Sequence, residues 1–224
     1  CGLIMFERIK NGAVSRDRVI AMLIIFVFNI LFWMFFKQSG SSFPFLADKA
    51  AGKEIRIIAA EPSACPTLTR GHYGYDFGDT AKMAPLLPMH TLGHGFVPPA
   101  IHSGGLRYHG MAPLVSHMVH TGIVEARAYH QSECFAEAVR FARAEGIIPA
   151  PEPSHALRAV AEEVERARQE GVERTILFNL CGHGNFDMGA YDAFLGGEMV
   201  DTELPQDELD QAAAEREGLP AIPA

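Results

Sequence analysis

The chain has 224 residues, 48% of them hydrophobic and 21% charged, which suits one large domain or two small ones and excludes a disordered or uniformly membrane-embedded chain. The formal net charge of -8 argues against a nucleic-acid-binding protein, because neutralising phosphates requires clustered Lys and Arg, and the sequence has no such cluster. The four cysteines have no paired spacing, which favours a reducing compartment over a disulfide framework.

The first element is an apolar run at residues 19–36, interrupted only by Asn29. About eighteen apolar residues are close to the minimum for a helix that crosses a bilayer, so we predict one transmembrane helix here. The flanking Lys and Arg residues slightly favour a cytoplasmic N-terminus, which would place the rest of the chain outside the cell. Because the sequence starts at Cys1 rather than Met, we also expect its true start to be missing.

Residues 32–42 read FWMFFKQSGSS and, with the basic loop before them, resemble a transmembrane helix of the proton-dependent oligopeptide transporters, which ends in FWxxFEQxGSS. Lys37 stands where that family has an acidic residue, so the resemblance does not imply a proton-linked role at this position. No second comparable apolar run follows, and one helix cannot form a transport path. We therefore expect a transporter-like segment at residues 1–42.

After residue 42 the pattern becomes that of a globular α/β protein. Residues 53–60 predict a strand, residues 63–79 a loop, and residues 79–87 a short helix capped at its start. Three helices and three short apolar strands then alternate. The predicted helices are 114–121, 132–145 and 154–169, each followed by a glycine, and the predicted strands are 123–129, 147–148 and 175–178.

This alternation predicts a parallel sheet covered by helices on both faces. We expect Ser132 to cap the second helix, and Glu162 to pair with Arg166 on the surface of the third. Beyond Val200 the chain is acidic and rich in alanine, which predicts a loose helix or a disordered tail at residues 201–224.

The strand at 175–178 leads into a tight turn with Gly182 and Gly184, and residues 188–195 predict a short helix after it. Cys181 closes the strand at the edge where open α/β sheets bind their ligands, and the glycines let a ligand approach the backbone closely. The turn is therefore a candidate binding site. The alternative interpretation is that the two glycines only form a turn.

Other motifs that carry chemistry are weak in this sequence. His117 and His120 lack a third ligand at helical spacing and no HExxH motif is present, so we do not expect metal catalysis. Ser154 and His155 are adjacent on a predicted helix, which suits a cap better than a nucleophile with its base. The sequence has neither a GxSxG motif nor a Walker loop, which removes the commonest hydrolase and nucleotide-binding functions.

Three segments together resemble the C-terminal half of tryptophan synthase beta chains in their order and spacing. They are GGLRYHGMAP at 104–113, EGIIPAPEPSHA at 145–156 and FNLCGHG at 178–184. Arg107 and the segment 129–135 resemble the divergent second subgroup of that family, whereas the main subgroup has Asp at the position of Arg107. The resemblance covers about residues 43–200.

The resemblance implies a fold-type II pyridoxal phosphate enzyme that makes L-tryptophan from L-serine and indole by β-replacement. It also implies a homodimer, a possible alpha subunit and a cytoplasmic location, with membrane anchoring through residues 19–36 as the alternative. The implied site residues are Cys181 at the pyridine nitrogen, Glu152, Gly105 and Gly182 around the cofactor, Arg107 on the substrate side, and the backbone carbonyls of Leu106, Tyr108 and Gly110 for a monovalent cation.

A neutral hydrogen-bonding partner at the pyridine nitrogen leaves the ring unprotonated, which favours elimination of the β-substituent over a long-lived carbanion. Cys181 stays neutral near pH 7 if its pKa is close to the usual value of about 8.5. Most of the family has Ser here, and a thiol is the weaker partner. The alternative for Cys181 is a buried core cysteine.

Features of the family's N-terminal half are missing from this sequence. None of the five lysines follows a histidine as the family's Schiff-base lysine does, and neither the glycine-rich phosphate loop nor the catalytic carboxylate of that half is present. We therefore expect a fragment that is inactive alone. Two alternatives stay open, namely another fold-type II lyase such as a serine or threonine dehydratase, and a non-catalytic chimera that is membrane-anchored or transporter-derived.

Overall fold

A computed structural model describes residues 55–222, together with Ile20 and Gly52. The chain divides into two compact units, Cys1–Ile55 and Arg56–Ala224, and the fold below is that of the second unit. The helix expected at residues 19–36 and the boundary expected at residue 42 lie outside the described residues and stay predictions. Among the described residues, no helix combines the length and the apolar character needed to cross a membrane.

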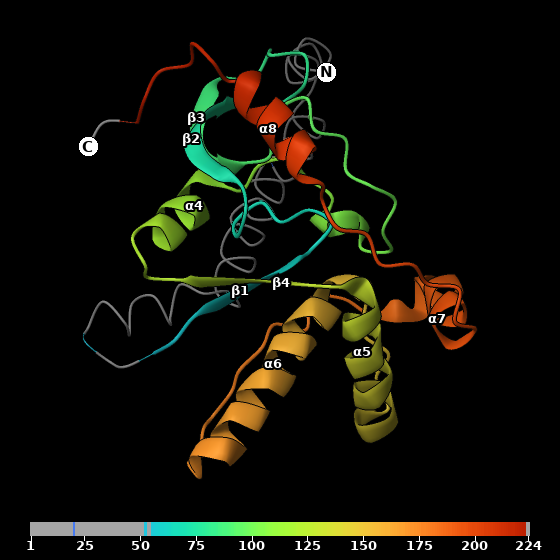
Figure 1. Ribbon diagram of the computed structural model, residues 1–224. Helices are drawn as coiled ribbons and strands as arrows, with labels where there is room; N and C mark the ends of the chain where they lie inside the picture. The colour runs from blue at the N-terminus through green and yellow to red at the C-terminus, as the bar shows by residue number, and fades with distance from the viewer. Residues whose placement is uncertain (1–19, 21–51, 53–54, 223–224) are drawn as a thin grey trace. The chain divides into compact units, whose positions relative to one another are not determined.

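A parallel pair of strands forms the first sheet, with β1 at Ile58–Pro62 and β4 at Glu125–Tyr129 (Figure 1). The register runs from Ile58 opposite Glu125 to Pro62 opposite Tyr129, so both strands end at the same edge. Helix α4, at Pro113–His120, leads into β4. The sequence predicted both strands, at residues 53–60 and 123–129, and the observed strands begin later than predicted. The parallel pairing is confirmed, but the sheet has two strands in the described part of the chain.

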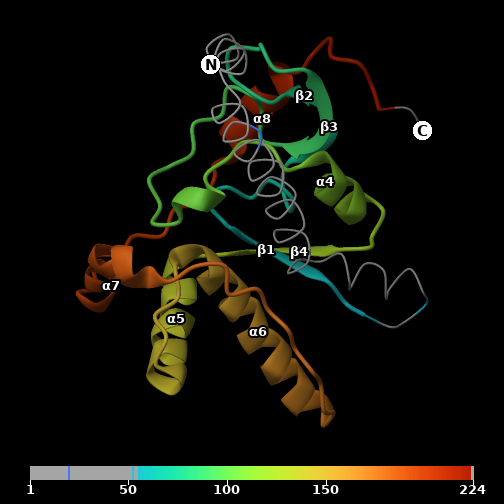
Figure 2. The same cartoon turned by 180° about the vertical axis from the view of Figure 1, so that it is seen from behind.

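Two helices, α5 at Gln131–Glu145 and α6 at Pro151–Glu170, pack against each other, and α6 also contacts β1 and β4 (Figure 2). Both end as predicted, because Gly146 and Gly171 adopt left-handed conformations with φ of 69° and 67°. α6 begins three residues earlier than predicted, since a proline suits the first turn of a helix.

The capping role expected of Ser132 is wrong. His130 is the N-cap residue of α5, and the backbone N–H and hydroxyl of Ser132 instead donate to the carboxylate of Asp201.

The predicted loop is confirmed for residues 63–71, but its second half and the predicted helix at 79–87 are wrong. Strands β2, at His72–Phe77, and β3, at Leu86–Thr91, form an antiparallel hairpin there. Between them the carboxylate of Asp79 accepts hydrogen bonds from the N–H groups of Met83 and Ala84, four and five residues further on. Lys82 has a φ of 58°, however, which stops a helix and turns the chain back.

The predicted strand at 175–178 is not a buried strand. Residues 172–181 run extended beside α6 without joining a sheet in the described part of the chain (Figures 1 and 2). The strand expected at 147–148 is reduced to one isolated bridge, between Pro149 and His183. A short 3₁₀ turn at Gly184–Phe186 follows, and the predicted helix is confirmed as α7, Met188–Leu195.

For the C-terminal segment, the structure shows the helical alternative, α8 at Gln206–Ala214. Leu204 precedes it and is buried in a core cluster with Cys65 and Leu92. Ala212 lies against Gly93, where an added Cβ would come within 2.7 Å of the alanine side chain. Residues 204–212 therefore pack against the core of the second unit.

Candidate functional site

The 3₁₀ turn η1, Gly104–Leu106, meets the start of α6 through one direct contact. The N–H of Gly105 donates to Oε1 of Glu152 at 2.8 Å. An added Cβ at Gly105 would lie 3.1 Å from Cγ of Glu152, so a side chain at this position would push the carboxylate away. Glu152 occupies the first turn of α6, where the positive end of the helix dipole favours a carboxylate.

A second contact, between the backbones of residues 148–150 and 182–184, places Cys181 and Gly182 at the start of α6. The N–H of Ala150 donates to the carbonyl of Gly182 at 3.0 Å, and the N–H of Gly184 donates to the carbonyl of Ile148 at 2.8 Å. An added Cβ at Gly182 would lie 3.0 Å from the Cβ of Ala150. Cys181 therefore sits beside the N-terminus of α6.

The thiol of Cys181 is exposed, so the alternative of a buried core cysteine is wrong. Partial burial raises the pKa of Cys181, and the negative charge of Glu152 raises it further. The thiol is therefore neutral near pH 7. These contacts bring Gly105, Glu152, Cys181 and Gly182 close together at the start of α6, and their role as a cofactor site stays a prediction.

Arg107 and the three predicted carbonyl donors lie at the end of the 3₁₀ turn or in the residues that follow it. The guanidinium of Arg107 is exposed and donates to the carbonyl of Pro98 at 2.9 Å. The carbonyl of Tyr108 accepts a long hydrogen bond of 3.4 Å from the hydroxyl of Thr67, and Gly110 bridges to Thr91. Leu106 closes the turn. Cation binding by these carbonyls stays a prediction.

Lysine is scarce around this site. Of the five lysines, Lys82 is the one that residues 55–222 contain, and it lies on the turn between β2 and β3. Its ammonium group is 6.0 Å from the ring centroid of Phe77. In that same range, no group of three or more His, Cys, Asp or Glu side chains is arranged to hold a metal ion.

Glu61 is a buried carboxylate that the sequence analysis treated only as a strand end. It is 1% exposed, and its oxygens accept hydrogen bonds from the N–H groups of Leu68 and Thr69 at 2.8 Å and from the Thr69 hydroxyl at 2.6 Å. Burial raises its pKa, although these hydrogen bonds oppose the shift. A charged residue at the carboxyl end of an apolar strand was the signal that could have found it.

A second missed feature joins the carboxyl ends of the two parallel strands. The hydroxyl of Ser63 lies 3.0 Å from Nδ1 of His130, whose Nε2 lies 3.4 Å from a carboxylate oxygen of Glu203. Ser63 and His130 each follow the last residue of β1 or β4, so the parallel register brings them together.

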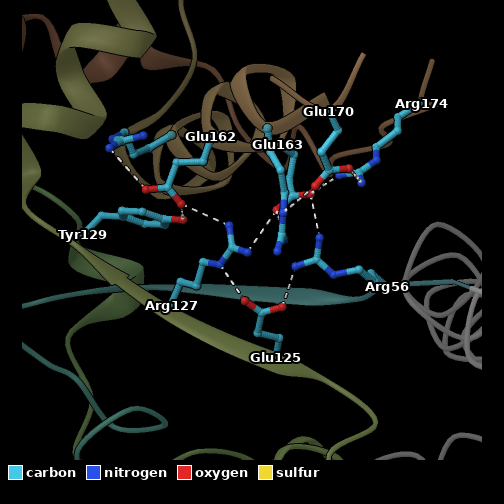
Figure 3. A network of polar contacts seen from close by, with 10 residues as sticks. Arg56, Glu125, Arg127, Tyr129, Glu162, Glu163, Glu170 and Arg174 are labelled. Atoms are coloured by element: carbon cyan, nitrogen blue, oxygen red, sulfur yellow. Dashed lines mark hydrogen bonds and ion pairs between the residues drawn. The ribbon is translucent and has the colours of Figure 1, made fainter. Parts of the chain in front are cut away.

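A network of charged residues holds α6 against the sheet, as Figure 3 shows. Arg127 on β4 donates to Glu125, Glu162 and Glu163, and Arg56 donates to Glu125 and Glu163. Burial alone would raise the pKa of Glu163, but the hydrogen bond from Arg127 and the charge of Arg56 outweigh it and lower that pKa.

The predicted pair of Glu162 with Arg166 is wrong. Glu162 instead binds Arg127, Arg158 and the hydroxyl of Tyr129, while Arg166 pairs with Glu163 and Glu170. The fold brings stronger partners to Glu162 than its own helix offers.

Histidines surround Tyr73 on the hairpin. The ring of Tyr73 stacks on His120 with centroids 4.1 Å apart, approaches His90 at 5.0 Å, and its hydroxyl lies 3.5 Å from Nδ1 of His117. His90 is 7% exposed. Burial lowers its pKa, and the neighbouring charges of His120 and His72 lower it further.

We therefore expect the chain to lose stability as the pH falls below about 6.5, the ordinary pKa of histidine. Because His90 and His72 have folded pKa values below that of the unfolded chain, the unfolded state binds protons first, and stability is complete above this pH. Urea unfolding at several pH values measures the slope, which is at most about 1.4 kcal/mol per pH unit for each histidine. An unchanged slope in His90→Asn would contradict the role of His90.

No protein-family model matches the chain. Its C-terminal part is 57% identical over 162 residues to the tryptophan synthase beta chain 2 of Methanosarcina acetivorans, a match that covers 72% of this chain and 37% of that protein. This part of the chain is tryptophan synthase beta-like.

The beta chain 2 of Aquifex aeolicus is 54% identical over 167 residues, covering 73% of this chain and 38% of the relative. The Thermotoga maritima beta chain 2 is 55% identical over 152 residues, covering 68% and 36%. The chain thus spans a little over a third of the length of the tryptophan synthase beta chains it matches. The mixed α/β fold with a parallel strand pair is consistent with this similarity.

Proposed function

We propose that the chain supplies one wall of the pyridoxal phosphate site of a tryptophan synthase beta-type enzyme, which joins L-serine and indole into L-tryptophan. The observation that carries this proposal is the contact between Gly105 and Glu152 beside Cys181, within a stretch that is more than half identical to tryptophan synthase beta chains. These residues come from three separate parts of the sequence.

The residues at this wall fit the ring of the cofactor. Cys181 offers an exposed, neutral thiol, which is a weak hydrogen-bonding group suited to an unprotonated pyridine nitrogen. Gly105 and Gly182 carry no side chains, so the backbone is open to close approach. When bound, pyridoxal phosphate supplies the electron sink for the reaction. The residues described here do not fit covalent attachment, because Lys82, the one lysine among residues 55–222, lies on the turn between β2 and β3 with its ammonium group over the ring of Phe77.

Glu152 positions the 3₁₀ turn that contributes Gly105 to the proposed cofactor site. By accepting the N–H of Gly105, its carboxylate fixes the 3₁₀ turn that lies at the start of α6. Arg107 follows this turn and is exposed, which suits a role on the substrate side. The carbonyls of Leu106, Tyr108 and Gly110 are the proposed donors for a monovalent cation.

The proposed partners follow from the same similarity. We expect a homodimer and an alpha subunit as partners of the complete enzyme, and a cytoplasmic location. A membrane anchor at residues 19–36 is the alternative, and carbonate extraction of the expressed protein separates the two. Protein that stays in the membrane fraction supports the anchor.

Pyridoxal phosphate is expected to slow alkylation of Cys181 several-fold, because the ring would cover its thiol. Cys65 and Cys134 are 1% and 0% exposed and serve as internal references, since their buried thiols react slowly with or without the cofactor. Peptide mass spectrometry after timed iodoacetamide treatment measures each cysteine separately.

The matched control is Glu152→Ala, which frees Gly105 and should reduce the protection of Cys181. Equal alkylation rates of Cys181 with and without pyridoxal phosphate would rule out the proposed contact.

A further inference from the structure

Residues 200–206 run past the carboxyl end of β4 to the start of α8, and side chains hold them there. The three residues that follow β4 make the first contacts, which are His130 with Glu203, Gln131 with the carbonyl of Val200, and Ser132 with Asp201. Arg70, in the loop after β1, donates to the carbonyl of Leu204 at 2.6 Å and to the side chain of Gln206 at 3.2 Å. Residues 199–204 make no backbone–backbone hydrogen bond within the described part of the chain. The hydrogen bonds that attach this segment therefore run through side chains.

A small apolar contact joins the same segment to residues 92–103, which lead from β3 into the 3₁₀ turn η1. The side chain of Leu204 is 4% exposed and lies in a cluster with Cys65 and Leu92. The partly buried side chains that pack against this cluster are those of Phe96, Ile101 and Leu209. Because Phe96 and Ile101 belong to residues 92–103, the C-terminal segment helps to hold the part of the chain that enters η1.

Helix α8 fits this part of the chain closely at one glycine. Gly93 has a φ of 96°, and an added Cβ there would lie 2.7 Å from the Cβ of Ala212. Ala212 is the residue of α8 that is buried. Figures 1 and 2 show α8 beside β2 and β3, close to the end of the strand that Gly93 follows. The docked position of α8 is therefore specific.

The C-terminal segment is nevertheless held less firmly than the helices that pack on the sheet. α8 has nine residues, and a helix of that length is not stable by itself in water. It buries Ala212, whereas α5 buries the larger side chains of Cys134 and Phe135 as well as Ala138. Elements with few buried apolar contacts and solvent-exposed hydrogen bonds open at a lower free-energy cost than the whole domain. The segment therefore meets the physical conditions for opening by itself.

We propose that residues 200–214 form a C-terminal strap that opens as one unit while α5 and α6 stay folded, and that residues 92–103 become mobile when it opens. The guanidinium of Arg107 donates to the carbonyl of Pro98, which lies within residues 92–103. The strap thus sets how firmly Arg107 is held. This inference goes beyond the proposed function, since it applies whether or not the chain binds pyridoxal phosphate.

Amide hydrogen exchange of the full chain at several low urea concentrations tests the proposal. The amides of α8 are expected to exchange about tenfold or more faster than those of α5. Their rates should also depend less on urea, because opening the strap exposes less surface than global unfolding does. The amide of Phe96, which donates to the carbonyl of Gly93, should exchange together with α8. Exchange of α8 at the rate and urea dependence of α5 overturns the proposal.

Gly93→Ala tests the contact that closes the strap, because its added Cβ collides with Ala212. The ratio of the α8 exchange rate to the α5 exchange rate should rise about tenfold. Gly122→Ala is the matched control. Gly122 also has a positive φ, 74°, but an added Cβ there meets no atom within 4 Å, so the variant introduces backbone strain without touching the strap. The same ratio in both variants contradicts the proposal.

Arg70→Ala takes the place of Gly93→Ala if that variant does not fold, since Arg70 is exposed and its guanidinium contacts the strap. It should raise the same ratio several-fold, and an unchanged ratio counts against the strap. If α8 exchange becomes faster while the amide of Phe96 keeps its protection, the coupling to residues 92–103 is overturned. These measurements need no cofactor, so their failure leaves the proposed function unaffected, and a failure to protect Cys181 leaves the strap unaffected.

Discussion

Replacing Phe135 by alanine is expected to lower the free energy of unfolding by about 3–5 kcal/mol. Its side chain is fully buried in a cluster with Ala138, Ala190 and Tyr191, and its ring lies 4.9 Å from that of Tyr191. The hydroxyl of Tyr191 donates to the carbonyl of Pro149 at 2.6 Å, next to the bridge with His183. The cluster therefore supports the backbone pairing that places Cys181.

Denaturant unfolding of the variant measures the loss, and Phe135→Leu is the matched control because it keeps most of the apolar volume. The leucine variant should lose clearly less stability. We also expect faster alkylation of Cys65 and Cys134 in Phe135→Ala, as the chain opens more often. A loss below about 1 kcal/mol for the alanine variant would show that this cluster is not the core that supports the site.

Replacing Glu61 by alanine is expected to cost about 2–4 kcal/mol. The carboxylate holds the loop after β1 by accepting hydrogen bonds from Leu68 and Thr69, and its removal leaves those backbone N–H groups without their acceptor. Buried donors without a partner carry the full cost of leaving water. The same loop contains Thr67, whose hydroxyl reaches the carbonyl of Tyr108.

Glu61→Gln is the control for this change, because its amide oxygen can still accept one of the hydrogen bonds. Its unfolding free energy should lie between those of the unchanged chain and Glu61→Ala. If both variants are as stable as the unchanged chain, Glu61 has no structural role, and its burial would point instead to a role in binding.

The features that the sequence predicted well are those that local interactions determine. α4, α5, α6 and α7 appear where apolar periodicity placed them, and the left-handed conformations of Gly146 and Gly171 end two of these helices. A helix buries one apolar stripe of its own residues and ends where a glycine can adopt the left-handed conformation. Residues close together in the sequence therefore set where it begins and ends.

The hairpin of β2 and β3 was missed because its local signal is ambiguous. Asp79 is a residue type that caps helices, but its carboxylate instead accepts from the N–H groups of Met83 and Ala84 within a turn, where Lys82 has a positive φ and two strands pair. The pairing of Glu162 was missed for a related reason. The i,i+4 rule describes an isolated helix, whereas the fold brings Arg127 from β4 to the same carboxylate.

The sequence by itself therefore determined helices α4 to α7, the three motif segments and the candidate residues Gly105, Glu152, Cys181 and Gly182. Only the tertiary structure decided that these residues meet, because the contacts of Glu152 with Gly105 and of Ala150 with Gly182 join segments far apart in the chain. It also decided that most of residues 172–181 are exposed, with Ile176 and Phe178 half-buried, since the burial of a strand depends on neighbours that its own sequence does not encode.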